Sequence, residues 1–355
     1  MENIELKGYK SFKDMNLQLR KINILIGANG AGKSNFLSFF EFLNAAYERR
    51  LKEFVALAGG TDRFLFEGSK VTSHIEAKMR FGSNSYSLDL VEGTDKFVFA
   101  HEKLGYSNYY TSNTLDINNF GDESALKFYN GLKRGDYIKG YVSGIKKYHF
   151  HDTGKQSPFT KSSNVDNDGN YLYSKGENLA AFLYNIREKA PKSYKRIIRV
   201  IQSVAPYFND FYLVPNTNGL VRLQWKDKFS DMTYGPTDLS DGTIRFVALA
   251  TLFLQPELPE VIIIDEPELG LHPFAIEKLS GLIHYAEQMG KQVIIATQSA
   301  QLISFFEPED VVTVNQVDGE TMMRRLDNDE LTLWLVDYSL GDMWQQNLFK
   351  GGQPA

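Results

Sequence analysis

The feature that most constrains this chain is the eight-residue segment Gly27–Ser34, which reads GANGAGKS. A short apolar run, Lys21–Ile26, precedes it, and the apolar residues of the next segment, Asn35–Arg50, recur at helical spacing. A glycine-rich loop between a strand and a helix lets backbone N–H groups turn inward around an anion, and the positive end of the helix points at the same place. The order of these segments therefore predicts a phosphate-binding loop in an α/β fold.

Two residues of this loop have the side chains that a bound nucleoside triphosphate requires. We expect Lys33 to reach the β- and γ-phosphates and the Ser34 hydroxyl to bind Mg²⁺. The other residues that we expect around the nucleotide are Asn29, Gly30, Ala31, Gly32 and Asn35. A chance match to the glycine pattern is the alternative, and the flanking strand and helix argue against it.

A second segment, Val261–Pro267, reads VIIIDEP and predicts a buried parallel strand that ends in two carboxylates. Open α/β sheets bind their ligands at the carboxyl ends of the strands. We expect Asp265 to hold Mg²⁺, directly or through water, and Glu266 to polarise an attacking water. Considered alone, the segment also fits a strand that ends in an ordinary acidic turn.

A third segment, Leu239–Thr243, reads LSDGT and opens a predicted helix. Ser240 at a helix N-terminus makes a second anion site, and Gly242 allows close approach of the backbone. On its own the pattern is typical of a helix cap. One phosphate loop holds one γ-phosphate, so a second anion-binding helix start needs a separate explanation.

Together these three segments resemble the Walker A, Walker B and signature motifs of the ABC-type ATPases. Glu268–Pro273 (ELGLHP) resembles their D-loop, and Ile295–Ser299 (IATQS) lies where their switch histidine usually lies. The resemblance covers residues 1–50 and 235–300. It implies an α/β P-loop NTPase fold with ATP and Mg²⁺ as cofactors.

Within that superfamily the chain resembles the RecF/SMC-like branch. Its start, Gly8–Phe12 (GYKSF), and the wide separation of Walker A from the signature are similar to that branch. More narrowly, Tyr148–Thr153 (YHFHDT), Gly176–Ala180 (GENLA) and the Thr-Gln-Ser switch resemble a family of stand-alone bacterial RecF-type ATPases that carry an AAA label.

The resemblance implies a homodimer in which two protomers pack head to tail around two ATP molecules. One protomer would supply its Walker A and Walker B residues, Lys33, Ser34, Asp265 and Glu266, and its partner would supply Ser240 and Gly242. Gln298 replaces the switch histidine. A glutamine can hydrogen-bond a γ-phosphate or position water but cannot carry a proton, so we expect slow hydrolysis.

The glutamine of the Q-loop has no obvious counterpart in this sequence. By position, His151 and Asp152 are the candidates, with Gln156 as a further one, and a strand end packed on the core is the alternative. The same HFHD cluster could also be a metal site. A basic residue from the first lobe that touches the nucleotide is expected from the resemblance, and Arg49, Arg50 and Arg63 are all candidates for it.

We expect one ABC-type ATPase head from residue 1 to 355, with a β-rich first lobe, a helical second lobe and no long coiled coil. Its parts would be a Walker A lobe with an antiparallel β insertion (1–150), a helical and signature lobe (151–240), and a Walker B, D-loop and switch part with the C-terminal segment (241–355). The insertion is predicted from three alternating runs, His74–Phe81, Ser85–Glu92 and Lys96–His101.

Composition narrows the function classes. The formal charge is −5 and there is no cysteine, which excludes a disulfide scaffold, a thiolate metal site and the zinc hook of some relatives. The 85 residues from 154 to 238 are too few for the long arms of SMC proteins. Glu307–Asp342 carries a net charge of −8, which leaves a net charge of +3 for the remainder. The overall charge therefore argues only weakly against DNA binding.

Three functions remain open. The first is an ATP-driven dimer that acts on double-stranded DNA in repair or in defence against foreign DNA, through a helical face with Lys192, Lys195, Arg196 and Arg199. A solvated face is the alternative for that basic run. The second is a regulatory ATPase that controls a separate effector such as a nuclease or toxin, and the third is a scaffold with structural nucleotide. No apolar run is long enough to span a membrane, so we expect a cytoplasmic location.

Overall fold

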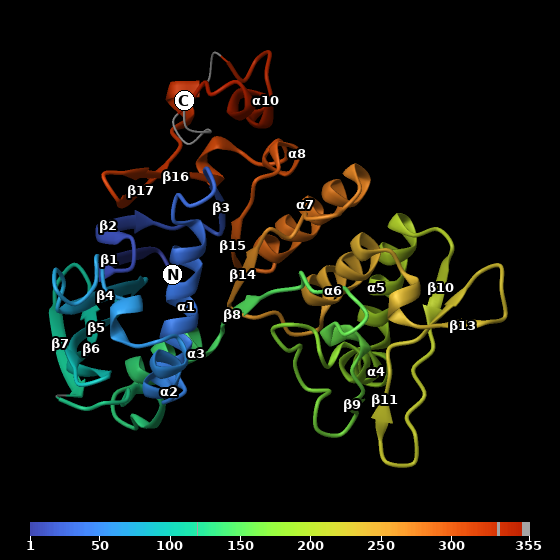
Figure 1. The fold of residues 1–355 in the computed structure, drawn as a ribbon, viewed down its shortest axis with the longest axis horizontal. Helices are drawn as coiled ribbons and strands as arrows, with labels where there is room; N and C mark the ends of the chain where they lie inside the picture. Colours follow the sequence, from blue (N-terminus) through green and yellow to red (C-terminus); the bar gives the residue numbers. More distant parts are fainter. Residues whose placement is uncertain (119, 332–333, 350–355) are drawn as a thin grey trace.

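The computed structural model describes residues 1–118, 120–331 and 334–349. Two six-stranded sheets and several helices make up most of the regular structure in this part of the chain. In Figure 1 the antiparallel sheet lies at the left, the strands of the mainly parallel central sheet run through the middle, and helices α4, α5 and α6 lie at the right. The predicted α/β class with a β-rich lobe and a helical lobe is confirmed.

The central sheet has the strand order β17-β16-β3-β15-β14-β8, and only the edge strand β17 is antiparallel to its neighbour. Its strands are β3 (Ile22–Ile26), β8 (Ile145–Tyr148), β14 (Val261–Asp265), β15 (Gln292–Ala296), β16 (Val311–Val317) and β17 (Glu320–Arg325). Nearly every residue of β3, β14 and β15 is buried, as a parallel sheet covered on both faces requires.

The second sheet is antiparallel throughout and has the order β2-β1-β4-β5-β6-β7. Its strands are β1 (Asn3–Tyr9), β2 (Phe12–Gln18), β4 (His74–Phe81), β5 (Asn84–Gly93), β6 (Lys96–Ser107) and β7 (Ser112–Asn118). Residues of β4 alternate strictly between exposed and buried, because only one face of this sheet packs on a core. The predicted three-stranded meander is thus the middle of a larger sheet that begins at the start of the chain.

Helix α1 (Lys33–Tyr47) lies between the two sheets. It contributes four phenylalanines that are at most 2% exposed, Phe36, Phe39, Phe40 and Phe42. They share one core with Leu25 of β3 and Ile263 of β14, whereas Ile24 and Ile262 belong to a second core. Alternate residues of the central strands therefore fill two different cores, and α1 packs in the core that the central sheet shares with the antiparallel sheet. This packing fixes the position of the loop that precedes α1.

The second core joins the central sheet to the helical lobe. Its helices are α4 (Leu179–Lys189), α5 (Pro191–Val204), α6 (Asp241–Leu254) and α7 (Pro273–Gln288). The sequence of Glu177–Tyr207 predicts a helix that is interrupted at Pro191. In the structure α4 ends before Ala190, and Pro191 opens α5, where its missing N–H costs nothing. The longest of these helices, α7, has 16 residues, so no coiled-coil arm occurs in the part of the chain that the structure describes.

Two segments of the helical lobe, Phe211–Val214 and Leu220–Trp225, have sequences that predict one strand each, and both predictions are wrong. The first strand ends at Phe211, and the second segment is split in two. The split occurs because β11 pairs with β9, whereas β12 pairs with β10 and β13, so the chain changes partner between them. The strands are β9 (Ser163–Asn164), β10 (Phe208–Phe211), β11 (Leu220–Val221), β12 (Trp225–Asp227) and β13 (Thr233–Tyr234).

The remaining elements are short, and most of them connect the larger ones. The α-helices are α2 (Leu51–Leu57), α3 (Lys133–Ser143), α8 (Ala300–Ile303), α9 (Asn328–Leu331) and α10 (Leu340–Gln345). The 3₁₀ turns are η1 (Thr61–Arg63), η2 (Leu126–Phe128), η3 (Pro158–Thr160), η4 (Pro236–Asp238) and η5 (Pro308–Asp310). Of the helices that the structure describes, none is both long and apolar enough to cross a bilayer.

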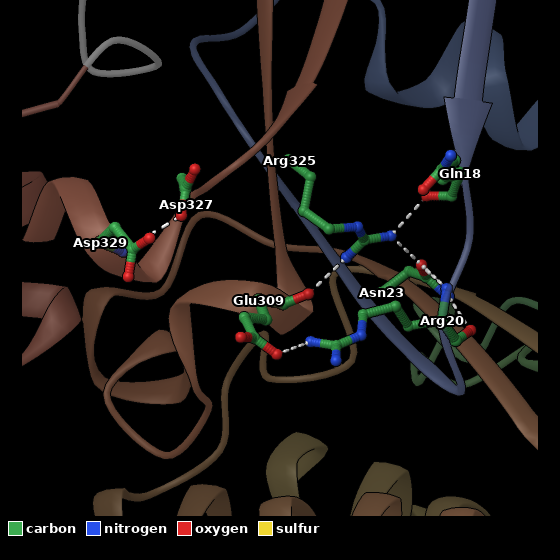
Figure 2. A network of polar contacts seen from close by, with 7 residues as sticks. All are labelled: Gln18, Arg20, Asn23, Glu309, Arg325, Asp327 and Asp329. Carbon is green, nitrogen blue, oxygen red and sulfur yellow. Dashed lines mark hydrogen bonds and ion pairs between the residues drawn. The ribbon is translucent and has the colours of Figure 1, made fainter.

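Arg325, at the end of β17, links the two sheets beside Gln18 and Asn23 (Figure 2). Its guanidinium donates to the carbonyl oxygens of Glu309 and Gln18, both at 2.8 Å, and to the side-chain oxygen of Asn23 at 2.5 Å. Burial, with a smaller contribution from nearby Arg20, lowers the pKa of Arg325 to about 10. The side chain therefore joins β17 to both β2 and the start of β3.

We expect Arg325→Met to lower the free energy of unfolding by about 2 to 3 kcal/mol, because three acceptors lose a charged donor in a partly buried place. Urea denaturation measures the change. Lys13→Met, on the exposed face of β2, is the control and should stay within about 0.5 kcal/mol of wild type. If the two variants behaved alike, Arg325 would not be the link between the sheets.

Candidate functional site

Three adjacent parallel strands bring the predicted site residues to one edge of the central sheet. Leu25 of β3 lies opposite Ala296 of β15, and Ala296 lies opposite Asp265 of β14. Because the strands end in register, the segments that follow them meet. They line a pocket of about 140 Å³ with Asn29, Gly30, Gly32, Lys33, Ser34, Asn35, Glu266 and Gln298.

The conformation of the Gly27–Ser34 loop depends on its glycines and on contacts with Thr321 of β17. Gly32 has a φ of 110°, and a Cβ there would lie 2.1 Å from the Thr321 hydroxyl oxygen, so only glycine fits. That hydroxyl is 2.9 Å from the carbonyl oxygen of Ala31 and 2.8 Å from the Ser11 hydroxyl. Asn35 also donates to Ser11, at 2.9 Å. Residues from both ends of the chain thus fix the loop.

Lys33 is buried and its ammonium lies inside the loop. It donates to the carbonyl oxygens of Gly27 at 2.6 Å and of Ala28 at 3.0 Å. Burial lowers the pKa of Lys33, and the carboxylates of Glu266 and Asp265 act in the opposite direction. The cation is therefore in place to exchange carbonyl oxygens for phosphate oxygens.

Ser34 and Asp265 fit the magnesium site that the sequence predicts. The Ser34 hydroxyl donates to a carboxylate oxygen of Asp265 at 3.1 Å. Two neighbouring oxygens of an octahedral Mg²⁺ at about 2.1 Å would be about 3.0 Å apart, so the pair already has the required spacing. Both are hard oxygen ligands of the kind that Mg²⁺ prefers.

Glu266 and Gln298 face each other across the pocket. The Gln298 amide nitrogen donates to the side-chain oxygen of Asn29 at 2.7 Å and also to a Glu266 carboxylate oxygen. Glu266 has a φ of 42°, in the left-handed region that a glutamate rarely adopts. Its backbone N–H donates to the carbonyl of Ala296 at 2.8 Å, which holds it there. Strain of this kind is common at functional sites.

The signature residues lie outside this pocket. Ser240 caps α6 by accepting from the Thr243 N–H at 3.2 Å, and it is exposed. A Cβ on Gly242 would lie 2.2 Å from the carbonyl oxygen of Gly270, so the predicted D-loop packs closely on the start of α6. None of the residues that line the pocket comes from α6.

The candidates for the Q-loop also lie outside the pocket lining. β8 ends at Tyr148 beside β14, and the His151 Nε2 lies 2.8 Å from the backbone oxygen of Asp265. A carbonyl oxygen only accepts, so this ring nitrogen carries the proton. Asp152 and Gln156 are exposed. Within the described residues no group of three or more His, Asp or Glu side chains comes together as a metal cage.

Arg49 and Arg50 follow the C-terminal end of α1, whose 15 residues span about 22 Å from the phosphate loop. The Arg49 guanidinium lies over the ring of Phe128, 5.3 Å from its centre. Arg63 lies in η1. None of the three lines the pocket.

Two buried charged residues beside the site were not singled out from the sequence. Arg245, 4% exposed, donates from α6 to the carbonyl oxygens of Phe150 and His151, both at 3.1 Å. Glu268 is 9% exposed and accepts from Thr297 and from the Gln298 N–H. In the sequence, Arg245 could have been noticed as the one basic residue in the apolar helix that follows Gly242. Glu268 fell inside the predicted D-loop, where nothing local set it apart.

A phosphate loop, a hydroxyl–carboxylate pair and a glutamate–glutamine pair at the ends of β3, β14 and β15 define a P-loop ATPase of the ABC type. The chain belongs to the family described as "AAA domain, putative AbiEii toxin, Type IV TA system", whose model matches residues 22–304, well over half of its length. Together with the relatives described below, this match confirms the prediction of an ABC-type, RecF/SMC-like ATPase.

Among curated proteins, the chain is similar to the Old nuclease of Escherichia phage P2, with 22% identity over 373 residues. The match covers 93% of this chain and 62% of the nuclease, so the chain spans less than two thirds of that relative. It also shares 36% identity over 62 residues with the energy-coupling factor transporter ATP-binding protein EcfA2 of Mycoplasmopsis synoviae (strain 53), covering 18% of this chain and 19% of EcfA2.

Among solved structures, the fold is similar to an SmcHead bound to the C-winged helix domain of ScpA, with a TM-score of 0.58 and 16% identity over 94% of this chain and 99% of that chain. It is also similar to an Smc head domain with an extended coiled coil, bound to the C-terminal domain of ScpA derived from Pyrococcus furiosus. The TM-score there is 0.55, with 16% identity over 95% and 98% of the two chains. At this identity the similarity shows the shared fold.

The backbone of Glu266 gives a test of strain at the site. We expect Glu266→Gly to raise the free energy of unfolding by about 1 kcal/mol, because glycine adopts the left-handed region without the steric cost that a side chain meets there. Urea denaturation of the two proteins measures this difference.

The control for this test is Glu277→Gly, on the exposed surface of α7. It is expected to lower the free energy of unfolding by about 1 kcal/mol, because glycine in a helix loses more conformational freedom. A loss of stability in both variants would contradict strain at residue 266.

Proposed function

We propose that this protein binds ATP with Mg²⁺ and hydrolyses it to ADP and phosphate. The observation that carries the proposal is the meeting of Lys33, Ser34, Asp265, Glu266 and Gln298 at the carboxyl edge of three neighbouring strands. The backbone of Gly30 and Gly32 and the start of α1 would bind the phosphates. Ser34 and Asp265 would hold Mg²⁺, which supplies charge neutralisation on the phosphate oxygens when it is bound.

In the proposed reaction Lys33 leaves the carbonyl oxygens of its own loop and binds the β- and γ-phosphate oxygens. The Glu266 carboxylate accepts a hydrogen bond from the attacking water and takes its proton as the water oxygen bonds to the γ-phosphorus. The bond from the γ-phosphorus to the bridging oxygen breaks in the same step, and that oxygen leaves with ADP. Gln298 donates to Glu266 and Asn29, so it aligns the carboxylate relative to the loop. Because an amide cannot carry a proton, Glu266 is the only proton acceptor among these residues, and we expect turnover to be slow.

We propose that ATP closes a head-to-tail homodimer, with Ser240 and Gly242 of each protomer against the nucleotide of the other. Two observations support this. The start of α6 is an exposed helix N-terminus with Ser240 as its cap, and it does not contribute to the pocket of its own chain. The fold is also that of Smc heads. The binding energy of ATP would then be used both to close the dimer and to position the phosphates.

The closed state is tested by Glu266→Gln. We expect this variant to bind ATP and to keep it, because the water loses its proton acceptor, and to have twice the protomer mass in light scattering with ATP and Mg²⁺. Lys33→Ala should bind ATP at least about tenfold more weakly, since the phosphates lose their buried cation, and should stay a monomer. An ATP-loaded Glu266→Gln protein that remained a monomer would overturn the sandwich, and a wild-type protein without ATPase activity would overturn the enzyme.

The biological target is proposed to be double-stranded DNA. Four basic side chains of α5 are exposed on the helical lobe, Lys192, Lys195, Arg196 and Arg199. Arg196 is also fixed by a hydrogen bond to the Tyr285 hydroxyl at 2.7 Å, which orders one of the cations on the surface. Such a face suits phosphate contacts that carry no sequence information. The similarity to the Old nuclease agrees with a role in DNA repair or in defence against foreign DNA.

A regulatory role is the second candidate. The family description names a toxin and a Type IV TA system, and the similar Smc heads are bound to ScpA domains. In this alternative the ATPase cycle controls a separate nuclease or toxin by opening and closing the protein surface that holds it. ATPase activity that is indifferent to DNA and responds to a co-purified protein would favour this alternative.

Salt dependence separates the two candidates. If α5 binds DNA, replacing Lys192, Lys195 and Arg199 by alanine should weaken duplex binding and reduce the slope of log K against log salt by about 3, since each phosphate contact contributes about 0.9. Fluorescence anisotropy at several salt concentrations measures both quantities. Alanine at three exposed lysines of the first lobe, Lys13, Lys52 and Lys70, is the matched control. An equal loss in both triple variants would contradict a specific role of α5.

A further inference from the structure

Glu268 is a buried carboxylate that contacts the segment after β15. It follows β14 in the turn that continues into the predicted D-loop, and it is 9% exposed. One carboxylate oxygen accepts from the Thr297 hydroxyl at 2.5 Å and from the Gln298 N–H at 3.2 Å. Its two partners are therefore Gln298, which lines the pocket, and Thr297, which immediately precedes it.

Burying the Glu268 carboxylate costs free energy, so a contribution to stability does not explain why a glutamate lies here. Burial raises the pKa of the Glu268 carboxyl, which means that its ionised form is disfavoured, and the hydrogen bonds from Thr297 and Gln298 act in the opposite direction. Its second carboxylate oxygen is buried without a hydrogen-bond partner among the described residues. A smaller neutral acceptor would hold the same two donors without burying a charge. Such a group next to a pocket is a candidate for a functional role.

We propose that Glu268 is a positioning residue that fixes Gln298 at the pocket, an inference that rests on the proposed ATPase function. The backbone around Gln298 is held from two sides. The Thr297 N–H donates to the carbonyl of Leu25 in β3 at 3.0 Å, and Glu268 holds the Thr297 hydroxyl and the next N–H. With its backbone fixed, the Gln298 amide spans from Asn29 to Glu266, where it aligns the group that takes the proton from water.

The same turn also contacts the start of the signature helix. The carbonyl oxygen of Gly270 lies against Gly242, as the 2.2 Å to a Cβ built there shows, and Arg245 lies 3.0 Å from a Cβ built on Gly270. Burial lowers the pKa of Arg245, and the negative charges of Asp241 and Glu268 act in the opposite direction. The residue that fixes Gln298 therefore belongs to a turn packed on α6, the helix proposed to meet the partner's nucleotide. In the proposed dimer, closure would therefore act on the turn that holds Gln298.

The test compares removal of the carboxylate with its conservative replacement. Glu268→Ala should lower kcat by about 10- to 100-fold, the range found when a residue that orients a site group is removed. The Kd for ATP, measured by fluorescent-nucleotide titration, should change by less than about twofold, because the phosphate loop is untouched. Glu268→Gln should recover most of the rate, since an amide oxygen accepts the same two hydrogen bonds. Thr297→Val, which removes the hydroxyl, should lower kcat, whereas Thr297→Ser, which keeps it, should have nearly the kcat of wild type.

A matched control separates positioning from general loss of stability. Thr313→Val removes a buried strand hydroxyl that donates to the carbonyl of Arg324 at 3.0 Å and does not line the pocket, so it should leave kcat unchanged. The decisive measurement is the double variant. In a Gln298→Ala background, Glu268→Ala should have no further effect on kcat, because it acts through the residue that is already absent.

The outcomes distinguish the inference from the function on which it rests. If Glu268→Ala lowered kcat by the same factor with and without Gln298, or raised the Kd for ATP in proportion, Glu268 would not act by positioning Gln298. ATPase activity that Lys33→Ala abolishes, together with a fully active Glu268→Ala, would overturn the inference and leave the proposed function standing. A wild-type protein without ATPase activity would overturn both.

Discussion

The parallel pairing of β15 with β3 on one side and β14 on the other is the constraint on which the rest of the structure depends. Its register places Leu25, Ala296 and Asp265 in one row across the sheet. The pairing continues one residue past the strands, through Thr297 N–H to Leu25 and Glu266 N–H to Ala296. Backbone hydrogen bonds of the sheet therefore position the residues that line the pocket. A shift of one residue in either ladder would separate Gln298 from Glu266 and Ser34 from Asp265.

The sheet can hold this register because it is buried on both faces. Alternate side chains of β3 and β14 enter two separate cores, one shared with α1 and the antiparallel sheet and the other with the helical lobe. A register shift would expose apolar side chains in both cores at once. The phosphate loop gains a further restraint from Thr321 and Ser11, which reach it from β17 and from the turn between β1 and β2. The ends of the chain thus stabilise a loop that the sequence places near its start.

The motifs of the site could be predicted from the sequence, because each is a contiguous segment with a local physical reason. The loop before α1, the strand before Asp265 and the helix start at Ser240 are of this kind. The break before Pro191, outside the site, could be predicted for the same reason. Strand β8, helix α3 and strand β7 lie in stretches with weak periodicity and were missed. Arg245 and Glu268 could not be assigned roles because their partners are 94 and 29 residues away, and only the folded chain brings them together.

The replacement of a switch histidine by Gln298 changes what the surrounding protein has to supply. A histidine can take up a proton, so moderate errors in its position can be offset by its chemistry. An amide only donates and accepts hydrogen bonds, and its contribution depends on where its nitrogen and oxygen lie. A site that relies on an amide therefore benefits from a fixed backbone at that residue. The ladder bond of Thr297 to β3 and the buried carboxylate of Glu268 provide such fixation from opposite sides. The slow hydrolysis that we propose and the buried acid next to Gln298 would then both follow from the same substitution.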